Sequence, residues 1–186
     1  MMDTAELPAL VLPVLVLGIA FLYSSVGFGG ASGYLAAMSL FAIAPQTMAS
    51  TALTLNVVVA SLAFVAFYRA GHLDWRLLWP FLITSIPAAF VGGYLHIDER
   101  FYLILLNVAL TYVAVRMLFN EHFTRALADE TTPDAFPLPL ALLAGLGIGL
   151  LSGMIGVGGG IFLAPLIVVA GWGTAKQAAA VAAAFI

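Results

Sequence analysis

Two glycine-rich motifs are the parts of this sequence best suited to do chemistry. The first reads GFGG over residues 27–30, and the second reads GVGGG over residues 156–160. Glycine permits positive φ and a close approach of the backbone, so each motif can end one helix and begin another. A helix that begins just after such a break points free N–H groups and the positive end of its dipole into the break. Each motif therefore predicts a binding site for a small anion.

Hydroxyl groups near the first motif could supply further hydrogen-bond donors to that site. Ser32 follows the motif closely, and Ser50 and Thr51 lie on the next apolar stretch, which also carries Thr54 and Asn56. No Lys or Arg lies in the predicted interior. An anion held only by amides and hydroxyls would be bound loosely enough to leave, as transport requires. The candidate substrate-binding residues are Gly27, Gly29, Gly30, Ser32, Ser50, Thr51, Gly156, Gly158, Gly159 and Gly160.

The small residues also allow two other interpretations. Small side chains let helices pack closely, and for Gly145 and Gly149 we favour packing, whereas for the two motifs we favour a break that lines a site. Residues 30–33, GASG, match the G-x-S-G pattern of intramembrane serine proteases, but such an enzyme needs a histidine beside its serine at membrane depth. All three histidines lie in predicted loops or at span ends. We therefore predict no enzyme, and no catalytic residue, metal site or cofactor.

The composition indicates a membrane protein. Of the 186 residues, 63% are hydrophobic and 8% are charged, whereas soluble domains carry about 25% charged residues. Residues 7–68 contain no Asp, Glu, Lys, Arg or His, and a membrane-spanning helix needs only about 20 apolar residues. The net charge of −3 gives no basic surface for nucleic acid, and the absence of cysteine excludes disulfides. We predict an all-α polytopic membrane protein whose partners are the lipid bilayer and a small-molecule anion.

Charged clusters divide the apolar sequence into membrane spans. A shorter apolar piece follows each glycine motif, at residues 32–44 and 161–171, and each piece is too short to cross a bilayer alone. We interpret these pieces as half-helices or re-entrant arms, since irregular backbone survives at membrane depth only where protein buries it or a polar cavity surrounds it. Full spans are predicted at 7–25, 46–68, 77–96, 101–119 and 138–155, and a last one starts near 174.

The two halves of the chain form an internal repeat. When the sequence is shifted by 129 residues, the G-x-G-G of the first motif falls on that of the second. The predicted organisation is a first transmembrane repeat at 1–119, a polar cytoplasmic linker at 120–136 and the start of a second transmembrane repeat at 137–186. The second repeat stops partway through its copy. We therefore expect an incomplete chain, completed by further C-terminal helices or by an oligomeric partner.

The charges favour inverted repeats. If each short arm is part of a crossing, the first repeat crosses the membrane an odd number of times, so the second repeat must be inverted. With the N-terminus outside, five of the six basic residues then lie on the cytoplasmic side. If the arms are re-entrant instead, the repeats are parallel and Lys176 moves outside. We favour the inverted arrangement and keep the parallel one as the alternative.

These motifs carry a family likeness. Twin glycine-rich motifs, one in each duplicated hydrophobic half, resemble those of the sulfite exporter TauE/SafE family. The second motif, with Pro165 and Leu166 behind it, is similar to the family's G-x-G-G-G pattern and its following Pro-Leu. The first motif departs from it, because Ala31 replaces the third glycine and Ala36 stands opposite Pro165. The resemblance covers essentially the whole chain and implies a multi-pass transporter of a bacterial inner membrane that moves sulfite, sulfonates or related sulfur-containing anions.

The function predicted from these features is export of such an anion by alternating access around the two glycine-rich breaks. Two alternatives stay open at this point, an anion channel and a non-transporting membrane subunit. Flux that saturates and shows counterflow would argue against the channel. A partner chain that supplies the missing helices would favour the subunit.

Overall fold

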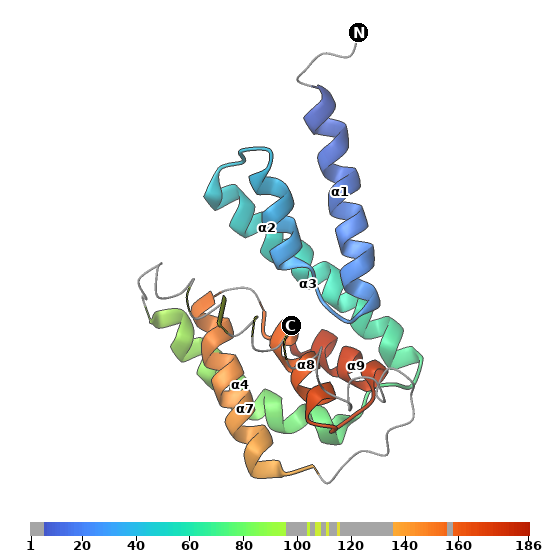
Figure 1. Ribbon diagram of the computed structural model, residues 1–186, viewed down its shortest axis with the longest axis vertical. Coiled ribbons are helices and arrows are strands. Elements are labelled where there is room, and N and C mark those ends of the chain that lie inside the picture. Colours follow the sequence, from blue (N-terminus) through green and yellow to red (C-terminus); the bar gives the residue numbers. More distant parts are fainter. Residues whose placement is uncertain are drawn as a thin grey trace.

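The part of the chain that the structure describes is built from helices. The structure, a computed structural model, describes residues 6–95, 104, 107–108, 111, 115, 136–155 and 158–186. Every regular element in this part is helical, as the all-α prediction requires (Figure 1). The elements are α1 (Glu6–Ser25), α2 (Ala31–Ser39), α3 (Pro45–Arg69), α4 (Trp75–Tyr94), α7 (Leu138–Ile155), α8 (Gly160–Val169) and α9 (Ala175–Phe185).

Four long helices coincide with predicted spans. α1, α3, α4 and α7 begin and end within two residues of the predicted bounds, and α9 begins next to the predicted start of the last span. The span predicted at 101–119 lies outside the described residues except for isolated helical positions. The linker predicted at 120–136 lies outside them up to residue 135. The division into the predicted domains therefore stays a prediction.

The apolar pieces after the glycine motifs form short helices, of 9 residues in α2 and 10 in α8. α2 ends at Ser39, before the end of the piece predicted at 32–44. The chain turns over residues 40–42, where Ala42 adopts left-handed backbone with φ 52° and the N–H of Ile43 donates back to the Met38 carbonyl at 3.5 Å. Pro45 disfavours the helical conformation only at the residue before it, and Ala44 accordingly has φ −57° and ψ 135°.

Side chains fix the first residues of α4 and α9. The Asp74 carboxylate accepts a hydrogen bond of 2.9 Å from the backbone N–H of Arg76 at the start of α4. At the start of α9, the Thr174 hydroxyl accepts from the Gln177 N–H at 3.3 Å, and the Gln177 side chain accepts from the Thr174 N–H at 2.9 Å. Such caps satisfy backbone donors that have no partner inside the helix.

Two of the described helical segments are long and apolar enough to cross a membrane, judged by length and composition. They are Ser50–Arg69 within α3 and Trp75–Tyr94, which is α4. Both present large apolar side chains outward: Leu62 on α3 is 66% exposed and Phe90 on α4 is 68% exposed. A helix that faces lipid leaves such side chains uncovered by protein, so this surface fits a membrane environment.

Helices α4 and α7 pack closely along their lengths (Figure 1). Glycines on α7 make this approach possible. A Cβ atom at Gly149 would lie 2.5 Å from the Cα of Ser85, and one at Gly145 would lie 3.0 Å from the Cα of Phe81. Small residues bring helix backbones together in this way. The packing interpretation of Gly145 and Gly149 is therefore confirmed.

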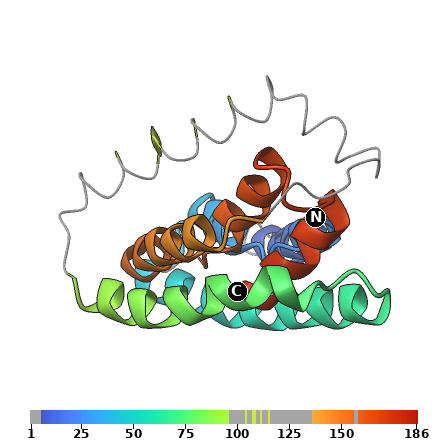
Figure 2. The same cartoon turned by 90° about the horizontal axis from the view of Figure 1, so that it is seen from below.

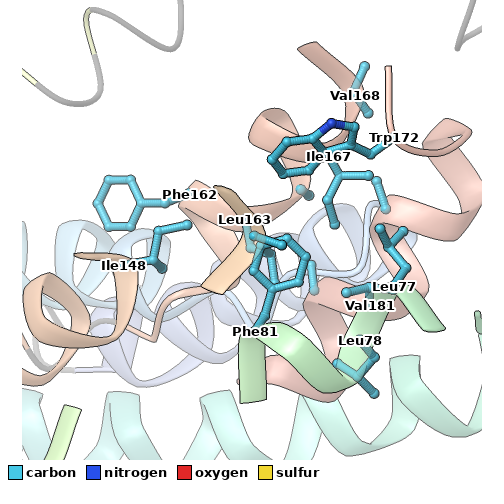
Figure 3. Close-up of a cluster of buried hydrophobic side chains, with 14 residues drawn as sticks. Leu77, Leu78, Phe81, Ile148, Phe162, Leu163, Ile167, Val168, Trp172 and Val181 are labelled. Carbon is cyan, nitrogen blue, oxygen red and sulfur yellow. The ribbon is translucent and has the colours of Figure 1, made fainter. Parts of the chain in front are cut away.

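The buried apolar side chains form two clusters. The larger one joins α4, α7, α8 and α9, and Phe81, Leu163 and Ile167 are fully buried in it (Figure 3). The smaller one lies between α1, α2 and α3, around Tyr34 and Met38. Each cluster thus holds one of the short helices that follow the glycine motifs.

Helices α3 and α9 contact each other and run in opposite directions. Phe67 near the end of α3 lines one cavity with Lys176 at the start of α9. Asn56 in the middle of α3 lines another with Ile186, just past the end of α9. Figure 2 shows α3 and α4 along one side of the molecule. α3 and α9 are corresponding helices of the predicted repeat, so their opposite directions support inverted repeats, which stay a prediction.

Candidate functional site

The first glycine motif breaks the chain between α1 and α2. Gly27 and Gly30 adopt left-handed backbone, with φ 79° and φ 91°. The N–H of Phe28 donates back to the carbonyl of Tyr23 at 2.9 Å, which closes the end of α1. Helix α2 begins directly after Gly30, at Ala31. The predicted helix break at this motif is therefore confirmed.

Asn56 of α3 reaches into this break. Its side chain is 4% exposed, and its Oδ1 accepts a hydrogen bond of 3.2 Å from the backbone N–H of Ala31. A Cβ atom at Gly29 would collide with the same carboxamide, so this position has room only for glycine. The residue before α2, Gly30, has no side chain with which to cap the helix. Asn56 supplies that cap from another helix.

The second glycine motif also meets Asn56. Gly158 adopts left-handed backbone with φ 81°, and a Cβ atom there would lie 3.2 Å from Nδ2 of Asn56. Helix α8 begins at Gly160, and the N–H groups of Phe162 and Leu163 both donate to the Gly159 carbonyl at 3.1 Å. One side chain therefore touches both motifs.

The chemistry of Asn56 fixes which way its carboxamide points. A backbone N–H can only donate, so the atom that faces Ala31 must be the carbonyl oxygen. The NH₂ group, which can only donate, then faces the side of Gly158. The structure thus places a neutral hydrogen-bond donor between the two glycine motifs.

A narrow cavity of about 10 Å³, roughly the space of one water molecule, lies at this junction. Both motifs line it, the first with Gly29 and Gly30 and the second with Gly158. Ser32 and Asn56 line it as well. The Ser32 Oγ lies 3.3 Å from the hydroxyl oxygen of Tyr23, another residue of the lining. The described lining therefore combines three neutral polar side chains with glycine backbone and with apolar side chains such as Phe28 and Ile161.

The structure brings four of the candidate substrate-binding residues to this cavity: Gly29, Gly30, Ser32 and Gly158. Ser50 and Thr51 are exposed on α3 and do not line it, and the Ser50 hydroxyl donates to the Thr47 carbonyl at 3.2 Å. Their predicted role in binding stays a prediction. Gly156 lies outside the described residues.

The remaining candidates, Gly27, Gly159 and Gly160, pack against α9. A Cβ atom at Gly27 would collide with the backbone of Ala179, and one at Gly159 would collide with the ring of Phe185. At Gly160 it would lie 2.9 Å from the Ala182 carbonyl oxygen. These three glycines let the backbone approach α9 closely. They position the two motifs against α9 and do not line the cavity.

Asn56 is the residue that the candidate list lacked. In the described part of the chain, the buried polar residues are Asn56 and Ser85. A signal was available in the sequence, since a carboxamide in a long apolar helix must find hydrogen-bond partners inside the protein or a cavity. The prediction named the hydroxyl residues Ser50 and Thr51 of the same stretch instead. Unlike a carboxamide, a hydroxyl can bond to the carbonyl one turn back in its own helix, as Thr54 does at 2.9 Å.

A comparison with protein families matches residues 12–186 to the sulfite exporter TauE/SafE model. The chain belongs to the sulfite exporter TauE/SafE family. This family is one of transporters by its name, and in the described part of the chain Ser32 lies against Tyr23 while His72 lies in the turn between α3 and α4.

Two curated relatives agree with the family. The chain is 42% identical over 167 residues to "Probable membrane transporter protein y4hK" of Sinorhizobium fredii, which covers 90% of this chain and 67% of that protein. It is 26% identical over 190 residues to "Probable membrane transporter protein MJ0441" of Methanocaldococcus jannaschii, covering 95% of this chain and 68% of that protein. No solved structure matches. As a member of the TauE/SafE family, the protein is a membrane transporter.

Proposed function

We propose that the protein exports a small sulfur-containing oxyanion, such as sulfite or an organosulfonate, across the cell inner membrane. The anion binds at the junction of the two glycine motifs. The two motifs and the helices behind them rearrange to open this site to one side of the membrane and then to the other. The family name and the geometry of the junction support this proposal.

The observation that carries the proposal is the contact of Asn56 with both motifs. The NH₂ group of Asn56 faces Gly158, while its oxygen is held by Ala31. An anion at the junction would accept from this NH₂ group and from the first-turn N–H groups of α2 and α8, which have no acceptor inside their own helices. The Ala31 N–H is already used, so Ser32 and Gly33 supply the next amides of α2.

The neutral lining suits an anion that must leave again. The described side chains that line the cavity carry no charge. A fixed Lys or Arg at this depth would hold an anion strongly, because Coulomb attraction increases as water is excluded. Amide and hydroxyl donors bind it more weakly. Turnover is then limited by the rearrangement of the two glycine motifs and not by slow release of a tightly bound anion.

The opposite directions of α3 and α9 support alternating access. Broken helices at the interface of inverted repeats are a recurring design in secondary transporters, with substrate bound between them near the middle of the membrane. Here the two breaks meet at one residue of α3. Because Asn56 lies beside both breaks, a movement of one break changes the position of the side chain that the other break contacts.

Flux measurements on reconstituted protein test the proposal. We expect saturable uptake and counterflow of sulfite into proteoliposomes by the wild-type protein. Asn56→Asp should lose this flux, because it removes the NH₂ donor and adds a charge that repels anions, while a carboxylate oxygen can still accept from Ala31. Ser85 on α4 is the other buried polar residue, so Ser85→Ala is the matched control and should transport normally.

Three results would count against the proposal. Flux that rises linearly with concentration and shows no counterflow would indicate a channel. Wild-type flux by Asn56→Asp would place the binding site elsewhere. Absence of flux for every sulfur oxyanion tested would remove the substrate class.

A further inference from the structure

Tyr34 carries a buried hydroxyl group without a hydrogen-bond partner. Its side chain is fully buried, and among the described residues its hydroxyl oxygen is the buried side-chain polar atom with no partner in the protein. Buried polar groups are nearly always paired, so each exception calls for an explanation. Tyr34 is also absent from the candidate residues that the glycine motifs and nearby hydroxyls suggest.

The unpartnered hydroxyl lies against the first glycine motif. Tyr34 is in the first turn of α2, and its backbone N–H donates to the Gly30 carbonyl at 3.0 Å. Side chains of a helix point toward its N-terminus, so the ring extends back to the break. A Cβ atom at Gly30 would lie 2.7 Å from the Tyr34 hydroxyl oxygen. Gly30, which has left-handed backbone and lines the cavity, therefore lies between residues of the junction and next to the hydroxyl.

The rest of the Tyr34 side chain is held by apolar neighbours. The ring packs in the smaller cluster with Met38, Ala52 and Val59. These side chains fix the ring and offer no acceptor to its hydroxyl. The same packing makes the hydroxyl a preorganised donor, because its position costs no further ordering when a ligand arrives.

We propose that the Tyr34 hydroxyl donates a hydrogen bond to the bound anion. The inference rests on the proposed function and deepens it by adding a residue to the substrate site. An oxygen of the anion accepts from Tyr34 when the turn at Gly30 moves during the transport cycle. Within the protein, the Tyr34 hydroxyl has no hydrogen-bond partner that would compete with the anion.

The placement of the donors also narrows the chemistry of the ligand. Asn56 packs against Gly29, whereas Tyr34 packs against Gly30, so the two side chains approach the motif at neighbouring residues. The Ser32 hydroxyl lines the same cavity. A ligand that uses all three must accept several hydrogen bonds at once, as sulfite and sulfonates can through the oxygens on one sulfur.

A conservative variant tests the proposal. Tyr34→Phe removes the hydroxyl and keeps the ring. We would measure the thermal stability of the purified full chain in detergent, alone and with increasing sulfite, sulfoacetate or chloride. For Tyr34→Phe we expect the sulfite concentration at half-maximal stabilisation to rise about fivefold to tenfold, the effect of one lost hydrogen bond. Without ligand, its melting temperature should equal or exceed that of the wild type. Tyr68→Phe, at an exposed ring stacked on Phe64, is the control and should respond as wild type.

The outcomes separate the two proposals. If sulfur oxyanions stabilise the wild type and Tyr34→Phe equally, the hydroxyl has no role in binding, the Tyr34 proposal is overturned and the proposed function stands. If chloride stabilises the wild type as well as sulfite does, the oxyanion preference is wrong. If no anion stabilises the wild type, the anion site itself is refuted and the Tyr34 proposal with it.

A spectroscopic measurement covers the case in which Tyr34→Phe does not accumulate. A new hydrogen bond from a tyrosine hydroxyl shifts the C–O stretching band of its ring. The infrared difference spectrum of the wild-type protein with and without sulfite should show this shift. A spectrum without any change in the tyrosine band would overturn the proposal.

Discussion

The backbone N–H of Ala31 donates a hydrogen bond to Oδ1 of Asn56 across 3.2 Å, although the two residues are 25 positions apart in the chain. The start of α2 is therefore fixed by a side chain of α3. The same side chain meets Gly158 of the second motif. Any movement of either glycine motif relative to α3 must change these contacts.

Replacing Asn56 by Leu should destabilise the protein. The variant leaves the buried Ala31 N–H without an acceptor, which costs about 1–3 kcal/mol. Asn56→Asp keeps an acceptor oxygen for Ala31 but buries an unpaired carboxylate, so it should also unfold below the wild-type midpoint, and it should lose transport. Unfolding in detergent, followed by tryptophan fluorescence, measures both. If Asn56→Leu is as stable as the wild type, the hydrogen bond does not hold the start of α2.

Replacing a glycine of either motif by Leu should abolish transport while insertion into the membrane stays intact. At Gly30 the side chain would meet the Tyr34 ring and would have to adopt left-handed backbone, which non-glycine residues disfavour. At Gly159 it would meet the Phe185 ring. Sulfite flux and the amount of protein in the membrane fraction measure the two properties separately.

Gly18→Leu is the control for these two variants. Gly18 lies on α1, and a Cβ atom there would meet nothing within 4 Å. This variant should insert and transport normally. Normal transport by both Gly30→Leu and Gly159→Leu would show that the substrate site lies away from the glycine motifs.

The contact between α4 and α7 should depend on Gly149 and not on Gly147. Gly149→Ala forces a methyl group into the backbone of Ser85 and should lower the free energy of unfolding by about 1–3 kcal/mol, the usual cost of overpacking. Gly147→Ala, two residues earlier, meets nothing within 4 Å and should be neutral or slightly stabilising. Equal midpoints for the two variants would contradict the close approach of the helices.

Inverted repeats predict that the α3–α4 turn and the start of α9 lie on the same side of the membrane. The chain contains no cysteine, so single cysteines can be introduced without a background. His72→Cys and Lys176→Cys should both be labelled by a membrane-impermeant maleimide in inside-out vesicles and protected in intact cells. Labelling of the two from opposite sides would establish parallel repeats instead.

Much of the helical structure could be predicted from the sequence. The bounds of α1, α3, α4 and α7 follow from apolar runs between charged or glycine-rich segments, and these are properties of consecutive residues. The break after α1 was also predictable, because glycine at residues 27 and 30 permits left-handed backbone that other residues resist. The end of α2 at Ser39 was not predicted, because the chain turns at Ala42 with left-handed backbone, a conformation that residues other than glycine disfavour.

The composition of the site was less predictable. The predicted candidates included Ser50 and Thr51, which do not line the cavity between the motifs, and omitted Asn56, which does. Whether a side chain of α3 faces a cavity, another helix or lipid depends on how α3 is rotated about its axis. That rotation is set by packing against α2 and α9, which the sequence of α3 alone does not contain.

The sequence by itself determined that this protein is a helical membrane protein with two glycine-rich breaks, because hydrophobic length and backbone freedom are local properties. Only the tertiary structure decided that both breaks meet at Asn56 and that Tyr34 keeps an unpartnered hydroxyl behind Gly30. Whether distant segments form a hydrogen bond or a close contact depends on differences of a few tenths of an ångström in the distance between their atoms. Those distances exist only once the helices have packed.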